Sequence, residues 1–289
     1  MKRLGLLWSA LSAAGVLVLA MAGVGSSATS TCLVVNTRVD QVYTTLQAAS
    51  DAATTLTGDT LSVKGTCYGV TTVSKSLTIL GRQQHRRRAT LNGGGSDRAV
   101  VSVVGGVTVA LSNLTITGGG VAGGAGGLGG GISNDGGTVT LTNTTITGNT
   151  ARLGGGVYNV GGGTITLDNS TVSDNTVGAG AGAGIYNDRA VVRLVNSTVT
   201  GSTGAEFGGG ISNHYGTLTL TGSTITHNTA QYGGGIFNDG GVTLGDSTVT
   251  GNTAQYGGGI YNAGAVTLEG GSTVTGNTPD DCVELPGTC

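Results

Sequence analysis

The sequence predicts an all-β solenoid, a protein in which short coils of β-strands stack along one axis. Near-copies of the motif Gly-Gly-Gly-Ile-Phe-Asn at residues 233–238 recur through the second half of the chain. Their aliphatic residues, at positions 132, 157, 185, 211, 236 and 260, lie 25, 28, 26, 25 and 24 residues apart, which indicates a repeat architecture. The composition agrees, because the 289 residues include 58 Gly and only 4% aromatic residues, unlike an ordinary globular core.

Residues 1–28 are typical of a secretory signal peptide. The basic start Met1-Lys2-Arg3 precedes an apolar run from Leu4 to Ala22 that ends in small residues. We expect cleavage near residue 22 or residue 28, and a mature protein that is secreted to the extracellular space or the cell surface and enters no membrane. A retained membrane anchor is the alternative, although the apolar run is near the lower length limit for a span.

Residues 32–57 are expected to form an N-terminal cap. Within them, Thr44 to Ala53 predict a short amphipathic helix with Leu46, Ala49 and Ala53 on one face. Such a helix could cover the open end of a stack of coils.

The four Cys of an exported chain favour two disulfides, for which three connectivities exist. We favour the pairs that are closest in sequence, which would staple both ends of the chain: Cys32 with Cys67, and Cys282 with Cys289. Residues 283–289 then form a C-terminal tail.

Four segments between the cap and the repeats alternate apolar and polar residues and end in Gly, as half-buried strands between tight turns do. They are residues 58–67, 73–81, 89–93 and 99–118. Between the second and the third lies a basic cluster, Arg-Gln-Gln-His-Arg-Arg-Arg at residues 82–88. We interpret this cluster as a solvated loop, and docking of a polyanion or a surface is the alternative.

Each repeat is predicted to contain three short strands, which in the unit around Ile236 are residues 236–238, 242–244 and 247–250. Period-two alternation points Phe237 and the Thr side chains outward and four aliphatic side chains inward: Ile236, Val242, Leu244 and Val249. Burial of four such side chains contributes about 6 to 12 kcal/mol per coil, which is less than the entropic cost of ordering the coil. Coils must therefore stack on their neighbours to fold.

The Gly-Gly-Gly-Ile-Tyr-Asn units resemble the repeats of right-handed parallel β-helix proteins of the pectin-lyase-like superfold. They are also similar to the GGA[IL]/FxxN repeats of polymorphic outer-membrane proteins and related bacterial surface proteins. The segments Leu46-Gln-Ala-Ala, Gly58-Asp-Thr-Leu and Gly65-Thr-Cys-Tyr-Gly69 resemble the first coil of exported bacterial β-helix proteins. The resemblance spans residues 32–282 and implies an all-β, single-stranded right-handed parallel β-helix with a short N-terminal capping helix. It implies no single activity, because the superfold hosts lyases, hydrolases and adhesins.

The sequence shows neither the Ca²⁺-binding carboxylate cluster of a pectate-lyase-like enzyme nor the convergent Asp residues of a polygalacturonase-like enzyme. The nearest group is Asp188, His214 and Asp239, which follow the repeat Asn in successive coils. Stacked about 4.8 Å apart, they would form a ladder able to act as a general base or to hold a metal. We interpret the group as a charge-compensated turn, and we expect no catalytic residue, no metal and no cofactor.

Two columns of Asn recur once per coil, and stacked amides can hydrogen-bond along the axis, so we expect both to be structural. They comprise Asn134, Asn159, Asn187, Asn213, Asn238 and Asn262, and Asn149, Asn175, Asn228, Asn252 and Asn277, with Ser202 at the missing rung.

A Thr-x-Thr pair, such as Thr248 and Thr250, also recurs once per coil. The predicted outward array of hydroxyl and methyl groups resembles the ice-binding face of β-helical antifreeze proteins. The alternative is that Thr simply suits exposed positions of a strand.

An outward aromatic column is the best predicted ligand surface. Four aromatic residues follow the repeat aliphatic residue, with Ser212 interrupting them: Tyr158, Tyr186, Phe237 and Tyr261. Their rings could stack on sugars or contact a partner protein, and packing between coils is the alternative.

Nucleic-acid binding is disfavoured, because residues 129–277 contain no Lys and only three Arg to neutralise phosphates. The sequence therefore favours an exported, monomeric, non-catalytic interaction or adhesion protein that binds a polysaccharide or a cell-surface protein. A polysaccharide lyase or glycoside hydrolase is the alternative, and an ice-binding protein that uses the Thr-x-Thr face is the third hypothesis.

Overall fold

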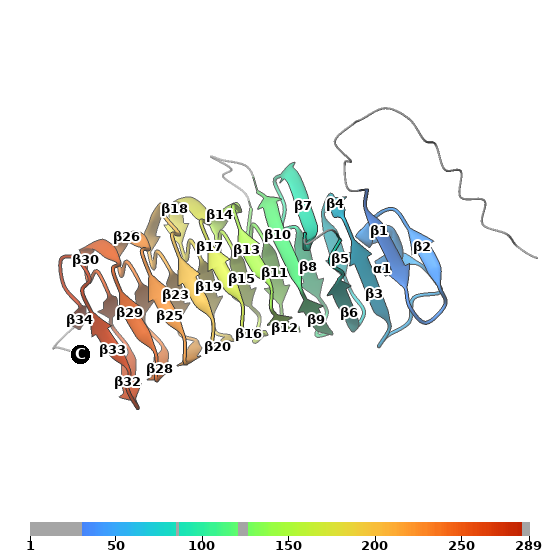
Figure 1. Ribbon diagram of the computed structural model, residues 1–289. Helices are drawn as coiled ribbons and strands as arrows, with labels where there is room; N and C mark the ends of the chain where they lie inside the picture. The colour runs from blue at the N-terminus through green and yellow to red at the C-terminus, as the bar shows by residue number, and fades with distance from the viewer. Residues whose placement is uncertain (1–30, 85–86, 121–126, 285–289) are drawn as a thin grey trace, which may run out of the picture.

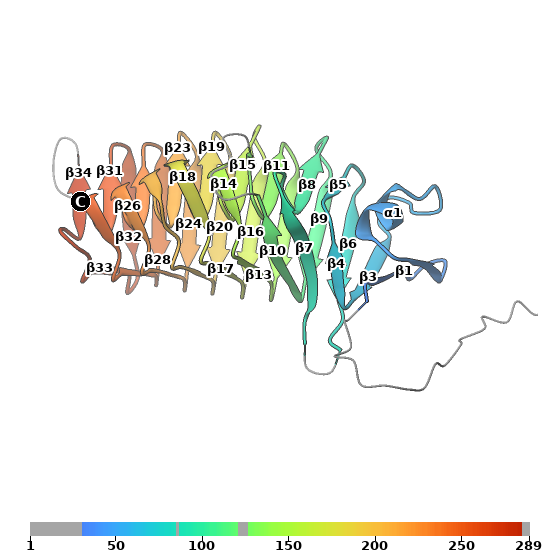
Figure 2. The same cartoon turned by 90° about the horizontal axis from the view of Figure 1, so that it is seen from above.

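The computed structural model describes residues 31–84, 87–120 and 127–284, and the predicted signal peptide lies outside them. These residues form a right-handed parallel β-solenoid in which three long sheets run along the axis and a shorter fourth sheet flanks them (Figure 1, Figure 2). The predicted fold class is confirmed. Among the residues described, no helix is long and apolar enough to span a membrane.

Sheet A has 11 strands and contains the N-terminal hairpin. Its order is β2 (Gln41–Tyr43), β1 (Leu33–Asn36), β3 (Thr60–Lys64), β6 (Leu77–Gly81), β9 (Thr108–Ser112), β12 (Thr138–Thr142), β16 (Thr164–Asp168), β20 (Val191–Val195), β24 (Thr217–Thr221), β28 (Gly241–Gly245) and β32 (Ala265–Glu269).

Sheets B and C have nine parallel strands each. Sheet B consists of β4 (Thr66–Tyr68), β7 (Ala89–Ser96), β10 (Leu114–Gly119), β13 (Thr145–Thr147), β17 (Thr171–Ser173), β21 (Thr198–Thr200), β25 (Thr224–Thr226), β29 (Thr248–Thr250) and β33 (Thr273–Thr275). Sheet C consists of β5 (Thr71–Val73), β8 (Val101–Val104), β11 (Ile132–Asp135), β15 (Val157–Val160), β19 (Ile185–Asp188), β23 (Ile211–His214), β27 (Ile236–Asn238), β31 (Ile260–Asn262) and β34 (Cys282–Glu284).

A fourth sheet of five strands, the side sheet, corrects the prediction of three strands per repeat. Its strands are β14 (Thr150–Leu153), β18 (Thr176–Ala181), β22 (Ala205–Phe207), β26 (Thr229–Tyr232) and β30 (Thr253–Tyr256). The chain passes through it between sheet B and the Gly triplet that precedes sheet C. The extra strand forms because this segment recurs in five successive coils, so its backbone groups can pair with the equivalent segment of the next coil.

The core runs through the prism bounded by sheets A, B and C. In the coil around Ile236 the predicted inward side chains are buried, at 0% to 2% exposure: Ile236, Val242, Leu244 and Val249. Register keeps each beside another aliphatic residue, since Ile236 pairs with Ile211 and Ile260, and Val249 pairs with Ile225. Each aliphatic side chain thus packs on the aliphatic residue at the same position of the next coil.

The N-terminal unit departs from the parallel pattern. Strand β1 pairs antiparallel with both β2 and β3, and helix α1 (Leu46–Asp51) lies beside them at the end of the solenoid (Figure 2). The helix is shorter than the predicted span, because it begins after the N-cap Thr45, whose hydroxyl accepts from Ala48 N at 3.1 Å, and ends at Asp51. Whether it acts as a cap stays a prediction.

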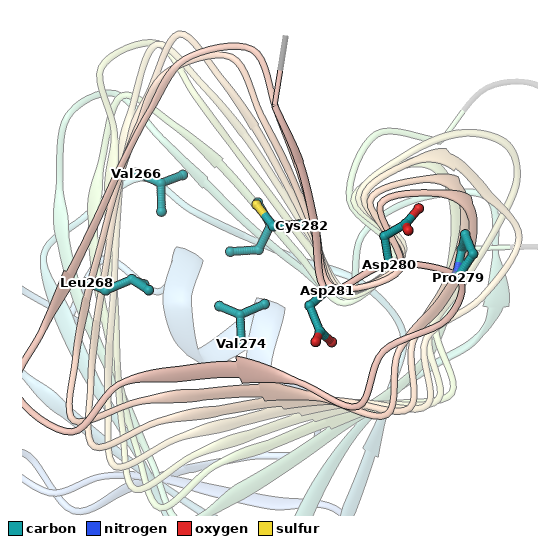
Figure 3. A pocket seen from close by; sticks show the side chains of 8 residues that line it. Val266, Leu268, Val274, Pro279, Asp280, Asp281 and Cys282 are labelled. Carbon is teal, nitrogen blue, oxygen red and sulfur yellow. The ribbon is translucent and has the colours of Figure 1, made fainter. Parts of the chain in front are cut away.

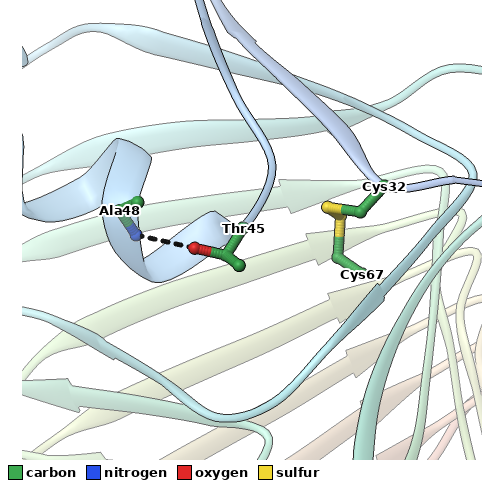
Figure 4. Close-up of a disulfide and its surroundings, with 4 residues drawn as sticks. All are labelled: Cys32, Thr45, Ala48 and Cys67. Atoms are coloured by element: carbon green, nitrogen blue, oxygen red, sulfur yellow. Dashed lines mark hydrogen bonds between the residues drawn. A yellow bond between two sulfur atoms is a disulfide. The ribbon is translucent and has the colours of Figure 1, made fainter.

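Disulfide bonding is seen at both ends of the described chain. Cys32 and Cys67 are joined by a disulfide beside the start of α1 (Figure 4), and this is the first of the two expected pairs. Cys282 is also disulfide-bonded, and its expected partner, Cys289, lies outside the described residues.

Candidate functional site

Eight rings form a continuous strip, here called the aromatic seam, between the outward face of sheet C and the side sheet. The first row consists of Tyr158, Tyr186, His214, Phe237 and Tyr261, and the second row of Phe207, Tyr232 and Tyr256. The parallel register creates the rows, because Tyr158 pairs with Tyr186 in sheet C and Tyr232 pairs with Tyr256 in the side sheet.

The first row is unbroken, although the aromatic column predicted from the sequence is interrupted at Ser212. The centroids of Tyr158 and Tyr186 lie 5.4 Å apart with nearly parallel rings, and those of Phe237 and Tyr261 lie 5.6 Å apart. Between these pairs the imidazole of His214 lies 5.3 Å from both Tyr186 and Phe237. Ser212 and His214 point to the same face of β23, so the small Ser212 side chain leaves room for the imidazole.

The second row packs against the first. Phe207 stacks on Tyr232 at 5.4 Å, and Tyr232 stacks on Tyr256 at 5.2 Å. Edge-on contacts join the rows, with Phe207 at 4.8 Å from Phe237 and Tyr232 at 5.3 Å from Tyr261. Such edge-to-face and offset stacked pairs each add about 0.5 to 1.5 kcal/mol beyond the area that they bury.

Phe237 is not the exposed contact that the sequence analysis expects. Its side chain points away from the core as predicted, yet only 8% of the residue is exposed. The reason is the side sheet, from which Phe207 covers the ring of Phe237. The other three predicted aromatic residues, Tyr158, Tyr186 and Tyr261, are half-buried, and Tyr256 at the end of the second row is the most exposed ring of the seam, at 47%.

Two phenols of the seam have raised pKa values. Burial, and then the charge of Asp188, raises the pKa of Tyr186 to about 12. Burial together with Asp188 and Asp135 also raises the pKa of Tyr158. The hydroxyl groups of Tyr158 and Tyr186 are therefore uncharged at neutral pH, and each can donate and accept a hydrogen bond.

The predicted ladder of Asp188, His214 and Asp239 forms only in part. His214 Nδ1 lies 3.1 Å from Asp239 Oδ2, and Tyr215 N donates to Asp239 Oδ1 at 2.8 Å. Asp188 lies next to His214 in the register of sheet C but bonds Arg189, at 3.3 Å. The Arg189 side chain in turn lies over the ring of Tyr215, 5.3 Å from its centroid.

Ser212 lies on the same face as this pair, so a Ser, a His and an Asp meet on sheet C. The Ser212 side chain is fully buried, and its Oγ makes no hydrogen bond. A nucleophile must reach both its base and a substrate. In this structure Ser212 reaches neither, and His214 acts as a packing member of the seam that Asp239 holds in place. Over the described parts of the chain, no three His, Cys, Asp or Glu side chains gather in a way that could hold a metal ion.

A second regular surface is the outward face of sheet B. Nine Thr residues stand in line on its consecutive strands: Thr66, Thr90, Thr115, Thr145, Thr171, Thr198, Thr224, Thr248 and Thr273. A second column two residues further along carries Thr or Ser from β13 to β33: Thr147, Ser173, Thr200, Thr226, Thr250 and Thr275. The six central pairs predicted from sequence thus lie side by side on one face.

The C-terminal coil contains a cavity of about 510 Å³ that is lined by core side chains together with Pro279, Asp280 and Asp281 (Figure 3). Val266, Leu268 and Val274 point into the prism there, while Pro279 and Asp280 lie in the smaller side loop. Leu268 is 48% exposed, whereas its register partner Leu244 is buried. Within residues 127–284, no further coil covers this end of the core, which accounts for the cavity.

The sequence places Phe207, Tyr232 and Tyr256 directly before Gly triplets. It does not predict that the side sheet aligns these rings in a second row against the first, or that the imidazole of His214 joins the first row. Comparison with protein-family models, curated proteins and solved structures finds no match for the chain.

Proposed function

We propose that this protein is an exported, non-catalytic extracellular or cell-surface β-helix of the pectin-lyase-like type that binds an extended polysaccharide along the aromatic seam. Export rests on the signal-like residues 1–28 and agrees with the Cys32–Cys67 disulfide, a bond typical of oxidising compartments. The Gly-Gly-Gly-Ile-Tyr-Asn repeats support the superfold.

The seam carries the proposal. Its two rows repeat once per coil, so they offer aromatic rings at a regular interval along the axis, and the Tyr members add hydroxyl groups. A polysaccharide is a ligand with its own regular repeat, and aromatic side chains offer it apolar area together with hydrogen-bonding hydroxyls. Most ring faces are already stacked on one another, so we assign sugar stacking to the exposed Tyr256 and hydrogen bonding to the phenols of Tyr186 and Tyr261.

A glycan array with the mature protein tests the proposal. We expect binding to at least one neutral extended glycan, and weaker binding by Tyr256→Ser. Tyr68→Ser is the matched control, because Tyr68 is even more exposed than Tyr256, at 67%, but lies on sheet B outside the seam. The control should bind as the wild type does.

The proposal is wrong if no extended glycan binds, or if Tyr256→Ser and Tyr68→Ser behave alike. Release of new reducing ends or of unsaturated products from the bound glycan would instead identify a glycoside hydrolase or a polysaccharide lyase.

Ice binding is the second candidate, favoured by the two in-register columns on sheet B. Regular hydroxyl and methyl groups on a rigid flat face could order water into a lattice. Thermal hysteresis of the pure protein tests this. We expect Thr224→Lys to abolish hysteresis and Thr219→Lys, on sheet A of the same coil, to leave it intact. A wild-type reading of zero would end this candidate.

A further inference from the structure

A basic ridge lies at the corner between sheets A and B, near the N-terminal end and away from the aromatic seam. It consists of Lys64, Arg82, Arg87 and Arg88, all exposed. Lys64 ends β3 where the chain turns into β4, and the next coil places Arg82 beside it, since Arg82 N donates to Val63 O at 2.7 Å. The same turn of that coil holds the inserted cluster of residues 82–88.

The described residues of this cluster, 82–84 and 87–88, project from the prism. Gln84 and Arg87 pair as an antiparallel bridge, and the segments on both sides of it extend beyond the outline of the neighbouring coils (Figure 2). Arg88 folds back along the corner, where its Nη1 donates to Asn143 O at 2.6 Å, two coils away. The ridge thus follows the axis over several coils.

Among residues 31–84, 87–120 and 127–284, the positive charges of the ridge have no carboxylate partners. None of the ion pairs found in the described parts of the chain involves them. Arg82 bonds the hydroxyl of Ser62 at 3.3 Å, and Arg88 bonds a carbonyl. Along this corner the next two coils carry the neutral Asn113 and Asn143, and the first acidic side chain, Asp168, follows in the third coil.

Charge is also unevenly distributed along the chain. Residues 31–120 contain eight Lys and Arg against four Asp, whereas residues 127–289 contain three Arg against eleven Asp and Glu. The N-terminal third is therefore positive within a protein that is acidic as a whole. An anionic partner is attracted to this end and repelled by the other.

We propose that the basic ridge binds an acidic polysaccharide, a chain of uronic acids or sulfated sugars. Arg guanidinium groups bind carboxylates and sulfates through paired hydrogen bonds, and a linear polyanion matches charges set along a corner. The ridge has no aromatic ring for stacking bases and no apolar side chain for entering a bilayer among its described residues, so nucleic acid and lipid fit it less well. The site is independent of the seam.

Titration of the mature protein with polygalacturonate at several salt concentrations tests the proposal. We expect polygalacturonate to bind with an affinity that falls as salt rises. Arg87→Gln/Arg88→Gln should weaken binding roughly tenfold, since it removes two exposed guanidinium groups from the ridge. Arg152→Gln/Arg193→Gln is the matched variant, which removes two exposed Arg from other surfaces and should change affinity by less than about twofold.

The proposal is overturned if polygalacturonate does not bind or binds with the same affinity at every salt concentration, or if the two double variants weaken binding equally. It is also overturned if duplex DNA or vesicles that contain phosphatidylserine bind more tightly than polygalacturonate. The seam is tested with neutral glycans and the ridge with a polyanion whose affinity depends on salt, so failure of this site and failure of the seam are distinguishable.

Discussion

The Asn ladders show how one side chain type serves every coil. Asn213 is fully buried; its Nδ2 donates to Asn238 Oδ1 at 2.8 Å, and its Oδ1 accepts from Asn187 Nδ2 at 2.8 Å. The ladder has a direction, because each Nδ2 donates to the Oδ1 of the Asn in the next coil. At its first rung, Asn134 Oδ1 has no partner, because the preceding residue in the register of sheet C is Val103, which has no side-chain donor. Every interior rung is satisfied by its copies.

We expect Asn213→Ala to lower the free energy of unfolding by about 2 to 4 kcal/mol, because it leaves buried amide groups without partners and opens a small cavity. Guanidinium denaturation measures the change. Gln231→Ala is the control: it removes a similar amide contact, with Gln255 at 3.2 Å, but on the exposed surface. If both variants lose the same free energy of unfolding, the buried Asn ladder contributes no more to stability than an exposed amide contact does, and the prediction is wrong.

Tyr186 makes the stability of the protein sensitive to alkali. Its pKa is raised from 10.0 to about 12 by burial and by Asp188, so the folded state holds the proton more tightly than the unfolded state does. Stability is therefore fully present below pH 10 and falls as pH rises from about 10 to about 12. Melting curves across this range should show a steeper loss for the wild type than for Tyr186→Phe, and parallel curves would refute this assignment.

At the scale of the element, the Gly triplets let the side sheet and sheet C meet. Gly209 lies in the turn that joins β22 to β23, and a Cβ atom there would come within 2.6 Å of the carbonyl oxygens of Gly234 and Thr229. Real Cβ atoms do not approach backbone oxygen this closely, and neither backbone can move without disturbing the next coil. Glycine is thus required in the triplet because the coils stack closely there, and not because the backbone must be flexible.

We expect Gly209→Ala to destabilise the protein by about 2 kcal/mol or more, since overpacking a tight backbone forces strain. Gly241→Ala is the matched control, because nothing lies within 4 Å of its added Cβ. Thermal melts of both variants decide the point, and a wild-type melting temperature for Gly209→Ala would show that the turn can relax.

The strands of the side sheet are the elements that the sequence pattern does not predict. Alternation identified the strands of sheets A, B and C, because one face of each is aliphatic. A strand such as β26, Thr-Ala-Gln-Tyr, has no aliphatic alternation, and it forms because its neighbours β22 and β30 supply pairing partners. Local sequence pattern carries no information about partners of that kind.

At the scale of the whole molecule, each coil contacts chiefly the coils before and after it. Stability is then close to a sum over coils and their interfaces, and an end can loosen while the middle holds. The N-terminal end is secured by the Cys32–Cys67 disulfide, which closes a loop with a sequence separation of 35 residues. In the chain-entropy account, a loop of that length stabilises by about 4 kcal/mol.

We expect Cys32→Ser/Cys67→Ser to lose amide hydrogen-exchange protection in the coils that contain β1, β3 and β4. Protection in the coils from β23 to β29 should stay at the wild-type level, because nearest-neighbour coupling does not carry the loss that far. Hydrogen exchange read by mass spectrometry, segment by segment, tests this. Uniform loss along the whole chain would show that the solenoid unfolds as a single cooperative unit.

The sequence by itself determined the solenoid, its period, its inward aliphatic side chains and the columns of Asn, Thr and aromatic residues. It could do so because repetition turns residues one period apart into spatial neighbours, so local alternation becomes long-range order. Only the tertiary structure decided which outward side chains remain exposed. The side sheet buries Phe237 and brings Phe207 to it, and the vacancy above Ser212 admits His214 to the seam. These contacts depend on the angle between two sheets, and no spacing along one chain encodes that angle.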